Sequence, residues 1–357
     1  MEEYREYKKT TGKHFLQLLE DPHDVAEVTM QPLRRYDVDA AILFSDILVV
    51  PQALGVKVDM PGGVGIVVPE PVTTGEEARA IAAKALADPA GVVRRELKHV
   101  TDAVTEIRKK QLAEKRDCAL LGFSAAPWTL FYYTVGANSR DSTPASTFAA
   151  AYPAETAELL DAFEVLVAEY CAAQLRAGAH AIQIFEAMGA SLDADAFDEL
   201  ALPRLQRLGE RLQGLGAADE SSSSEQKPPL LAFARGVAAP ERINAALSKT
   251  SGGPYDVITL DTDADRARYR EACFDGACLQ GNLDPRLLVD DCDASSDRLD
   301  AAIDAMLGDF GSCQRLIANL GEGLSGKESQ ALVAYYVDAV HAKSAKRIAE
   351  ETSEALL

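Results

Sequence analysis

Short apolar runs alternate with longer amphipathic stretches along the chain. Seven runs of four to six residues are largely apolar rather than strictly alternating, as strands buried on both faces of a parallel sheet are. We predict these strands at residues 39–44, 118–123, 181–185, 230–234, 257–260, 277–280 and 316–320. Alternation of strands and helices predicts an α/β fold with a parallel sheet wrapped by helices.

Between these strands, apolar residues recur at helical spacing. We predict helices at residues 14–19, 25–33, 76–115, 156–177, 297–307 and 328–348, with a break at 89–91. Residues 2–9 are charged, so no strand is predicted before residue 39. A closed barrel of this class needs eight strands. We therefore expect a TIM (β/α)8-type barrel that lacks its first strand.

Composition and charge argue against several classes of protein. The chain has 357 residues and a formal net charge of −20, which argues against holding nucleic acid by bulk charge. No apolar run is long enough for a membrane span, and the first thirty residues lack a secretory core. Six cysteines without a C-x-x-C pair indicate reduced thiols and a cytoplasmic location. We expect one domain, 1–357, with a Ser-rich surface insertion at about 217–229.

Asp46 is the first candidate for chemistry. It follows the first predicted strand, at the end where α/β barrels build active sites, and apolar residues 47–50 come next. A carboxylate among apolar side chains is costly unless a cation or N–H groups meet it. Two interpretations stay open: an active-site carboxylate, or a cap on the following helical turn.

Aromatic residues gather after the second predicted strand. Trp128 follows Pro127 where the strand gives way to a helix, and Tyr132 and Tyr133 come about one turn later. Such side chains can wall a flat organic ligand, but they serve more often as core. Both uses stay open for this segment.

Two glycine-rich segments and the histidines carry weaker signals. Residues 321–326 match the G-x-G-x-x-G spacing between a strand and a helix, but no second strand follows to complete a dinucleotide-binding unit. An anion site at that helix N-terminus stays open. Residues 61–65 predict a turn. The five histidines lack metal-ligand spacing, so we expect no metal centre and a structural role for His180.

Five segments, in order along essentially the whole chain, resemble the uroporphyrinogen decarboxylase family. The first is long and specific: Gln-Pro-Leu-Arg-Arg-Tyr-Asp-Val-Asp-Ala-Ala-Ile-Leu-Phe-Ser-Asp-Ile-Leu-Val-Val-Pro-Gln-Ala-Leu-Gly at 31–55. The others are Ala-Pro-Trp-Thr-Leu within 122–133, Gln-Ile-Phe-Glu at 183–186, Leu-Gln-Gly-Asn-Leu-Asp-Pro at 279–285 and Ile-Ala-Asn-Leu-Gly-Glu-Gly at 317–323.

The resemblance implies a single TIM barrel, commonly a homodimer, that uses neither a metal nor an organic cofactor. It implies decarboxylation of the four acetate arms of uroporphyrinogen to give coproporphyrinogen in porphyrin and haem biosynthesis. Asp46 stands where the family places the aspartate that meets the pyrrole N–H groups. Tyr133 and Phe185 match family residues that line the substrate cleft.

The chain departs from the family pattern at three places. Ala187 and Met188 stand where the family has a serine and a histidine, and Glu322 stands where it has a histidine. The family's N-terminal Arg-Gln-Ala-Gly-Arg-Tyr motif, which holds substrate carboxylates, has no counterpart, and Arg5 aligns with an arginine that follows it. We expect Ala187, Glu322 and Arg5 to lie at the substrate site.

Two functions stay open on this basis. The first is an active uroporphyrinogen decarboxylase. The alternative is a truncated or inactive homologue that binds a tetrapyrrole or a partner. With seven strands and no arginine motif, we expect the 357-residue chain to self-associate and to have little or no decarboxylase activity. A corrinoid-linked methyltransferase of the same fold needs a zinc site, for which His-x-Cys spacing is missing.

Overall fold

Seven parallel strands form one sheet in the computed structural model, which describes residues 2–60, 65–217, 227–273, 277–289 and 296–354. The strands follow one another in the sheet in chain order, and each neighbouring pair is parallel. All seven predicted strands are confirmed: β1 Ala40–Ile42, β2 Ala119–Ala125, β3 Ala181–Glu186, β4 Leu230–Ala234, β5 Val257–Thr259, β6 Cys278–Leu283 and β7 Leu316–Leu320.

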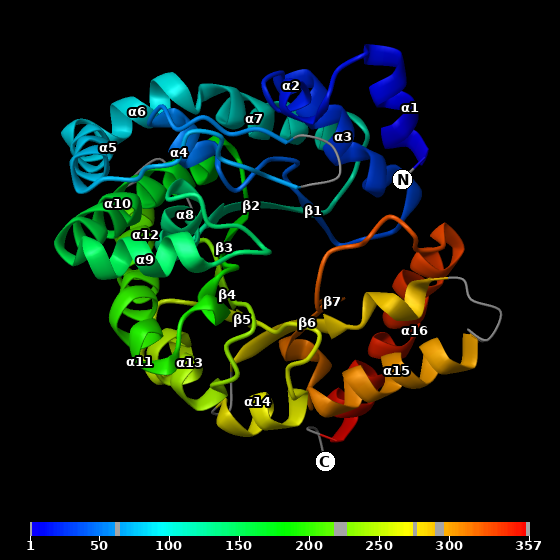
Figure 1. The fold of residues 1–357 in the computed structure, drawn as a ribbon. Coiled ribbons are helices and arrows are strands. Elements are labelled where there is room, and N and C mark those ends of the chain that lie inside the picture. The colour runs from blue at the N-terminus through cyan, green and yellow to red at the C-terminus, as the bar shows by residue number, and fades with distance from the viewer. Residues whose placement is uncertain (1, 61–64, 218–226, 274–276, 290–295, 355–357) are drawn as a thin grey trace.

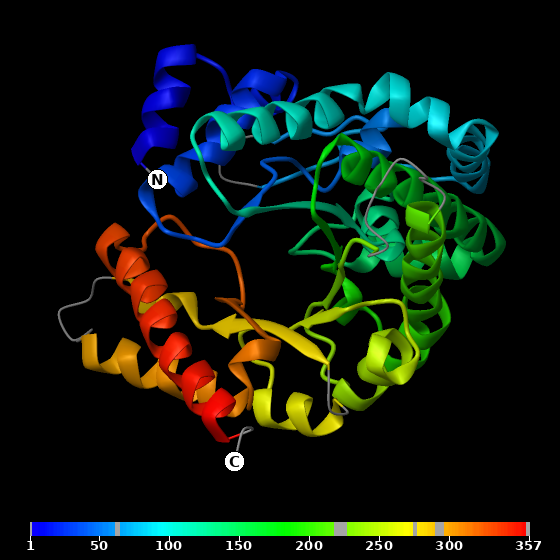
Figure 2. The same ribbon diagram turned by 180° about the vertical axis from the view of Figure 1, so that it is seen from behind.

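The sheet curls around a central axis with the helices on its outside (Figures 1 and 2). Within the described residues β1 and β7 do not pair, so the α/β sheet is an open, curved one. The first and last helices flank this seam (Figure 1). Two side-chain contacts cross it: Arg35 to Gln330 at 2.6 Å and His341 to Asp39 at 3.0 Å.

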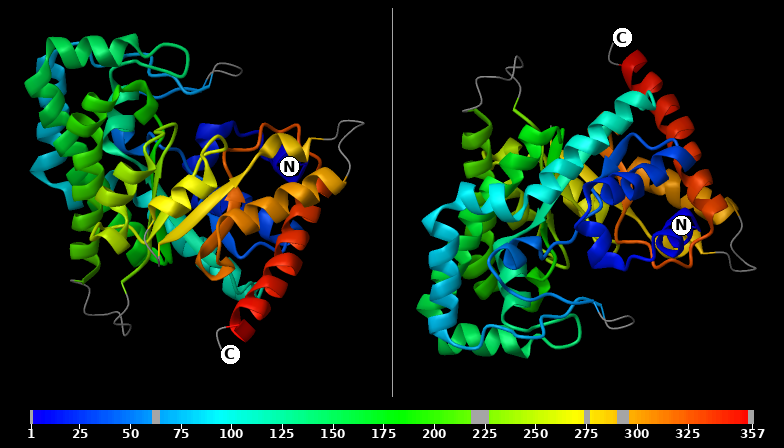
Figure 3. Two further views of the ribbon diagram at one scale, coloured as in Figure 1. Left: turned by 90° about the horizontal axis from the view of Figure 1, so that it is seen from below. Right: turned by 90° about the horizontal axis from the view of Figure 1, so that it is seen from above.

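The predicted helices are present with shifted ends. The longest, α10 (Pro153–Ala177) and α16 (Gln330–Glu354), lie on opposite sides of the molecule (Figure 3). The other helices of eight or more residues are α1 Glu2–Thr11, α3 Pro22–Arg35, α5 Gly75–Ala87, α6 Pro89–Glu96, α7 Lys98–Ala113, α8 Pro127–Thr134, α9 Thr143–Ala151, α12 Leu202–Ala217, α13 Pro240–Leu247 and α15 Ser296–Asp309. Short helices α2 Phe15–Leu19, α4 Val49–Ala53, α11 Ala194–Ala196 and α14 Arg266–Ala272 complete the α set.

The break predicted at residues 89–91 is present and lies one residue earlier, at Asp88, between α5 and α6. Pro89 is the first residue of α6, because Asp88 caps this helix by accepting the N–H of Gly91 at 2.9 Å. Proline fits the first turn of a helix, where its missing N–H costs nothing. A second break, at Leu97, separates α6 from α7.

The side chains on the outward and inward faces of the sheet pack against different partners. The outward side chains, such as Ile182 and Leu279, are fully buried against the helices. The inward side chains near the amino ends of the strands form a separate small cluster of Ala181, Leu231 and Val257. Because side chains alternate along a strand, the residues two and four positions further on also point inward, toward the carboxyl ends.

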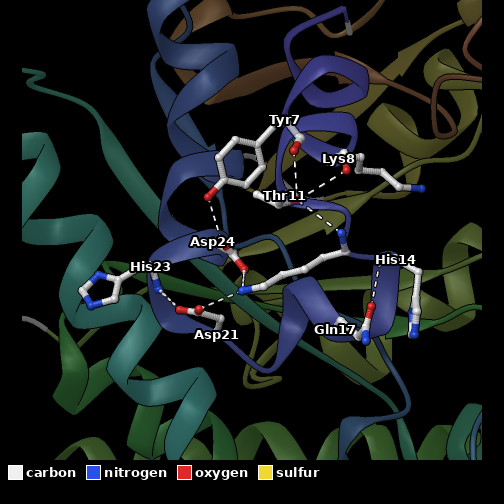
Figure 4. Close-up of polar contacts among 9 residues, drawn as sticks. Tyr7, Lys8, Thr11, His14, Gln17, Asp21, His23 and Asp24 are labelled. Atoms are coloured by element: carbon white, nitrogen blue, oxygen red, sulfur yellow. Dashed lines mark hydrogen bonds and ion pairs between the residues drawn. The ribbon is translucent and has the colours of Figure 1, made fainter.

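The N-terminal helix α1 is fixed to α3 by a buried carboxylate. Asp24, 5% exposed, accepts the phenol of Tyr7 at 2.6 Å and the ammonium of Lys13 at 2.5 Å (Figure 4). Lys13 also reaches Asp21 at 3.0 Å, and these contacts raise the pKa of Lys13. Hydrogen bonding to Asp24, added to burial, raises the pKa of Tyr7. Residues 2–35 therefore form helices α1 to α3, with α1 held against α3 by charged side chains, and they add no strand to the sheet.

Two sequence predictions fall largely on undescribed residues. The Ser-rich segment at about 217–229 lies mostly outside the described residues, between α12 and β4. Residues 61–64, which belong to the turn predicted at 61–65, also lie outside the described residues. On either side of them, Asp59 and Val67 pair in antiparallel fashion, which is the pairing that a turn between them needs.

Candidate functional site

Asp46 lies in the loop after β1, at the carboxyl edge of the sheet. Its side chain is 5% exposed, and Oδ1 accepts the backbone N–H of Leu48 at 2.7 Å. This bond fixes the turn that leads into α4, so the capping interpretation is correct for one oxygen. Oδ2 has no hydrogen-bond partner among the residues that the structure describes.

Asp46 also has no basic counter-ion within the described part of the chain. Burial raises the pKa of its carboxyl group, and the Leu48 N–H opposes that rise. An ionised carboxylate buried without a cation is unstable relative to its hydrated form. Such a group can stabilise positive charge that a ligand brings into the site.

Tyr133, on the last turn of α8, lies near enough to Asp46 for the carboxylate to act on its hydroxyl electrostatically. Its ring is half-buried and packs edge-on against Tyr132 at a centroid distance of 5.6 Å. Burial raises the pKa of its hydroxyl, with smaller contributions from Tyr132 and Asp46, while Arg235 lowers it. The phenol, the carboxylate and the guanidinium therefore share one electrostatic environment. Trp128, in contrast, is 1% exposed and belongs to the core.

A row of phenylalanines lines the inner face of the sheet next to these groups. Phe185 on β3 packs edge-on between Phe123 on β2 and Phe233 on β4, at centroid distances of 5.8 and 5.9 Å. We call these three residues the phenylalanine row. Phe123 and Phe233 are 8% and 9% exposed, and Phe185, expected at the cleft, is the central and only half-buried member of the row.

Arg235 directly follows β4 and extends its ladder, because its N–H donates to the carbonyl of Glu186 at 3.0 Å. Phe233 points inward, so the alternation of side chains directs Arg235 to the same face, above the phenylalanine row. One nitrogen, Nη2, lies 3.4 Å from Oε2 of Glu322, which follows β7. Glu322 thus faces the interior edge, and Arg235 opposes its charge.

Arg235 and Glu322 lie on the rim of a cavity of about 500 Å³. The segments after β4, β5, β6 and β7 supply its walls, which include Asp261, Arg268 on α14, and Arg286. Sequence reasoning missed all three arginines. The signal that would have found Arg235 is its position immediately after a buried strand, the rule already applied to Asp46.

Ala187 lies at the same edge, half-buried, directly after β3. Its methyl group offers no hydrogen bond, and its N–H donates to Oγ1 of Thr129 at 2.9 Å. The adjacent Glu186 is 1% exposed and accepts the Thr129 hydroxyl at 2.5 Å. Burial raises the pKa of Glu186 to about 7. This pair ties the end of β3 to α8, which carries Tyr133.

Arg5 is not brought together with the other predicted site residues. It is exposed on α1, and no hydrogen bond or ion pair of its side chain is found within the described residues. Asp46, Tyr133, Phe185, Ala187 and Glu322 all lie at or just below the carboxyl edge of the sheet.

The weaker sequence signals have structural explanations. Helix α16 begins at Gln330 rather than at Gly326, and the carboxylate of Glu328 accepts the N–H groups of Ser325 and Gly326 at 2.7 and 2.8 Å. That carboxylate occupies the place of an external anion. His180 is structural, because its Nδ1 accepts the N–H of Leu120 at 2.8 Å.

The described ranges contain neither a metal-binding cluster nor a membrane-spanning helix. No group of three or more His, Cys, Asp or Glu side chains there could hold a metal ion. No helix among those residues is long and apolar enough to cross a bilayer. The five described cysteines are free thiols, three of them buried.

Comparison with known proteins shows relatedness along nearly the entire chain. Residues 1–343 match the family described as uroporphyrinogen decarboxylase (URO-D). The uroporphyrinogen decarboxylase of Mus musculus is 36% identical over 343 residues, covering 96% of this chain and 86% of the relative. That of Homo sapiens is 35% identical with the same coverage, and that of Salinibacter ruber is 35% identical, covering 95% of this chain and 88% of its own. The chain belongs to the uroporphyrinogen decarboxylase family.

Solved structures share the fold at lower identity. A methyltransferase from Methanosarcina mazei superposes with a TM-score of 0.71 at 18% identity, covering 94% of this chain and 90% of that one. A B12-independent methionine synthase from a Shewanella species has a TM-score of 0.53 at 12% identity, covering 93% and 89%. These likenesses concern the α/β architecture alone.

Proposed function

We propose that this member of the uroporphyrinogen decarboxylase family is itself a uroporphyrinogen decarboxylase. It would remove CO₂ from the four acetate arms of uroporphyrinogen to give coproporphyrinogen, without a metal or an organic cofactor. We further propose that the curved seven-strand sheet belongs to a (β/α)8-type barrel and that the protein works as a homodimer.

The observation that carries the proposal is the state of Asp46. Its carboxylate is buried, lacks a counter-ion among the described residues and keeps one oxygen out of the local turn. A tetrapyrrole that presents converging N–H groups supplies the hydrogen bonds that this oxygen lacks. Preorganised negative charge of this kind acts on the charge that develops during reaction.

The chemistry follows from that charge. A proton adds to the pyrrole carbon next to the one that bears the acetate arm, and the ring becomes a cation conjugated with the arm's methylene carbon. The bond between the arm's methylene and its carboxylate then breaks, its electron pair neutralises the ring, and CO₂ leaves. The exocyclic methylene takes up a proton to become methyl, and the ring loses the proton it gained. Asp46 would stabilise the cationic ring, and Tyr133, whose raised pKa keeps its hydroxyl protonated, can donate a hydrogen bond beside it.

The rest of the site suits a macrocycle with a charged periphery. The phenylalanine row provides a surface on which an apolar ring system can lie. Arg235 stands above that surface, at the edge where peripheral carboxylates would be. Apolar walls with a few polar groups at defined places are the usual make-up of a ligand site.

The test is release of CO₂ from uroporphyrinogen by the wild-type chain and by Asp46→Asn. We expect the variant to fold and to lose activity by about 10²-fold, the cost of removing one such electrostatic group. Asp88→Asn is the matched control, because Asp88 also caps a turn but lies at the exposed start of α6. Equal rates for Asp46→Asn and the wild type would refute the proposal.

A second candidate is a homologue that binds tetrapyrrole without turning it over. It is favoured by Ala187, whose methyl group cannot donate a hydrogen bond, and by Glu322, whose carboxylate is negative where the family has a histidine. Saturable binding of uroporphyrin together with no CO₂ release from uroporphyrinogen would establish this alternative.

A further inference from the structure

Arg235 lies between two groups of site residues: Tyr133 and Asp46 on one side, and Glu322 with the cavity on the other. On one side it acts on the Tyr133 hydroxyl, which also senses Asp46. On the other side it faces Glu322 across the rim of the 500 Å³ cavity. Its position directly above Phe233 places its charge at the margin of the phenylalanine row.

Arg235 also has more unused donor capacity than the other arginines of the cavity. Arg268 binds both oxygens of Glu241 at 3.1 and 3.0 Å. Arg286 holds Asp284 through Nε and Nη2 at 2.9 and 2.8 Å. Among the described residues, the guanidinium of Arg235 has a single hydrogen-bonded contact, at 3.4 Å, although it carries five N–H donors.

The partner of Arg235 is held loosely. The side chains of Arg235 and Glu322 are 50% and 40% exposed, and pairs of this kind contribute little to stability. The other acidic residues of the cavity are engaged elsewhere: Asp261 accepts the N–H of Gly236 at 2.6 Å and Asp265 that of Arg268 at 3.0 Å. Asp263 acts on Arg286.

We propose that Arg235 binds a carboxylate of the substrate and that Glu322 is the resting counter-ion which that carboxylate displaces. This inference rests on the proposed function, because it takes the ligand to be a tetrapyrrole with a carboxylate periphery. A planar guanidinium can grip a carboxylate through two parallel hydrogen bonds, which the single long contact with Glu322 does not achieve.

The exchange makes binding sensitive to the number of carboxylates on the ligand. A ligand must offer a carboxylate near Arg235 to replace Glu322, and uroporphyrin has eight where coproporphyrin has four. Glu322, once released, points to solvent or to Arg286, whose pKa it already helps to raise. Arg235 therefore sets affinity and selectivity, while Asp46 acts on the reacting ring.

The experiment is a fluorescence titration of the full chain with uroporphyrin and with coproporphyrin. The variants are Arg235→Gln, Arg235→Lys and Glu322→Gln, and Arg268→Gln is the matched control because it removes an arginine of the same cavity that is already paired. We expect Arg235→Gln to weaken uroporphyrin binding about tenfold, as loss of a charge-assisted hydrogen bond does. Arg235→Lys should recover part of this loss, Glu322→Gln should tighten binding about threefold, and Arg268→Gln should change it little.

The outcomes separate this inference from the proposed function. If Arg235→Gln binds uroporphyrin like the wild type, or if Arg268→Gln weakens binding as much, the inference is overturned even when the wild type releases CO₂. If the variants follow the expected order but the wild type releases no CO₂, only the decarboxylase assignment fails. In an active enzyme, Arg235→Gln should raise KM more than it lowers kcat, and the reverse split would contradict a binding role.

Discussion

Replacing the buried Glu186 by glutamine should stabilise the protein at neutral and alkaline pH. Glu186 is 1% exposed, and its partners are the hydroxyl of Thr129 at 2.5 Å and the N–H of Met188 at 3.3 Å. Burial raises its pKa from 4.5 to about 7, so ionisation is unfavourable in the folded state. The amide oxygen of Glu186→Gln can still accept the Thr129 hydroxyl and carries no charge to bury.

The direction and size of the stability change follow from the difference between the pKa of Glu186 in the folded and in the unfolded chain. Below pH 4.5 the carboxyl is protonated in both the folded and unfolded states, and its contribution to stability is fully present. Between pH 4.5 and about 7 the unfolded chain releases the proton while the folded one keeps it, so stability falls as pH rises. At about 1.4 kcal/mol per pKa unit, the full loss is about 3 kcal/mol above pH 7.

The assay is thermal unfolding of wild type and variant at pH 5 and pH 8. We expect similar midpoints at pH 5 and a higher midpoint for Glu186→Gln at pH 8, by several degrees, since about 1 kcal/mol shifts a chain of this size by roughly 2 °C. Glu164→Gln is the matched control: Glu164 is also 1% exposed, but Arg207 and Arg211 each bind it at 2.6 Å. Loss of that charge should destabilise the protein.

Two results would refute the reasoning. The first is a Glu186→Gln variant less stable than the wild type at pH 8. The second is a difference between variant and wild type that does not change from pH 5 to pH 8. Either would mean that Glu186 is not a buried acid with a raised pKa.

Three further predictions concern packing, the seam and Glu322. Gly122→Ala should destabilise the fold by about 1–3 kcal/mol in thermal unfolding, because its Cβ would lie 2.5 Å from Gln174 Oε1 and 2.9 Å from Ile182 Cδ1; an unchanged midpoint would contradict this. The edge strands β1 and β7 expose Ile42 and Ile317 (53% and 38%), so the wild type should self-associate in analytical ultracentrifugation and Ile42→Glu with Ile317→Glu should associate less. Glu322→His should tighten uroporphyrin binding in a fluorescence titration by relieving carboxylate repulsion and freeing Arg235, and equal or weaker affinity would count against it.

The strands could be predicted because burial leaves a strong mark on composition. A central parallel strand has both faces covered, so it reads as a continuous apolar run bounded by polar residues. The ends of the strands were predicted less accurately than their existence. Strand β6 continues to Leu283 through Gly281 and Asn282, which resemble a turn in sequence, because Asn282 is 1% exposed and donates to the carbonyls of Asp261 and Ala264.

Helix ends depend on side chains whose bonding the sequence leaves open. Asp88 both follows the last residue of α5 and caps the start of α6, and its bond to the N–H of Gly91 explains why a new helix begins directly at Pro89. Similarly, the helical periodicity starting at residue 328 predicts the existence of α16. Its first residue is Gln330 because Glu328 bonds backward to Ser325 and Gly326 instead of joining the helix.

The place of Asp46 at the carboxyl edge of the sheet could be predicted from the sequence, whereas that of Arg235 was missed, for a reason of distance along the chain. Asp46 carries a local signal, a charge followed by apolar residues, whereas Arg235 looks like any surface arginine until its partner is known. That partner, Glu322, is 87 residues away and becomes a neighbour only because the sheet curls. Yet parallel strands bring all their carboxyl ends to one edge, so a polar residue just after any buried strand is a candidate without knowledge of the curvature. Applied to every strand, that rule selects Arg235, Asp261 and Glu322 along with Asp46 as candidates at one edge, while the pairing of Arg235 with Glu322 depends on the curvature of the sheet.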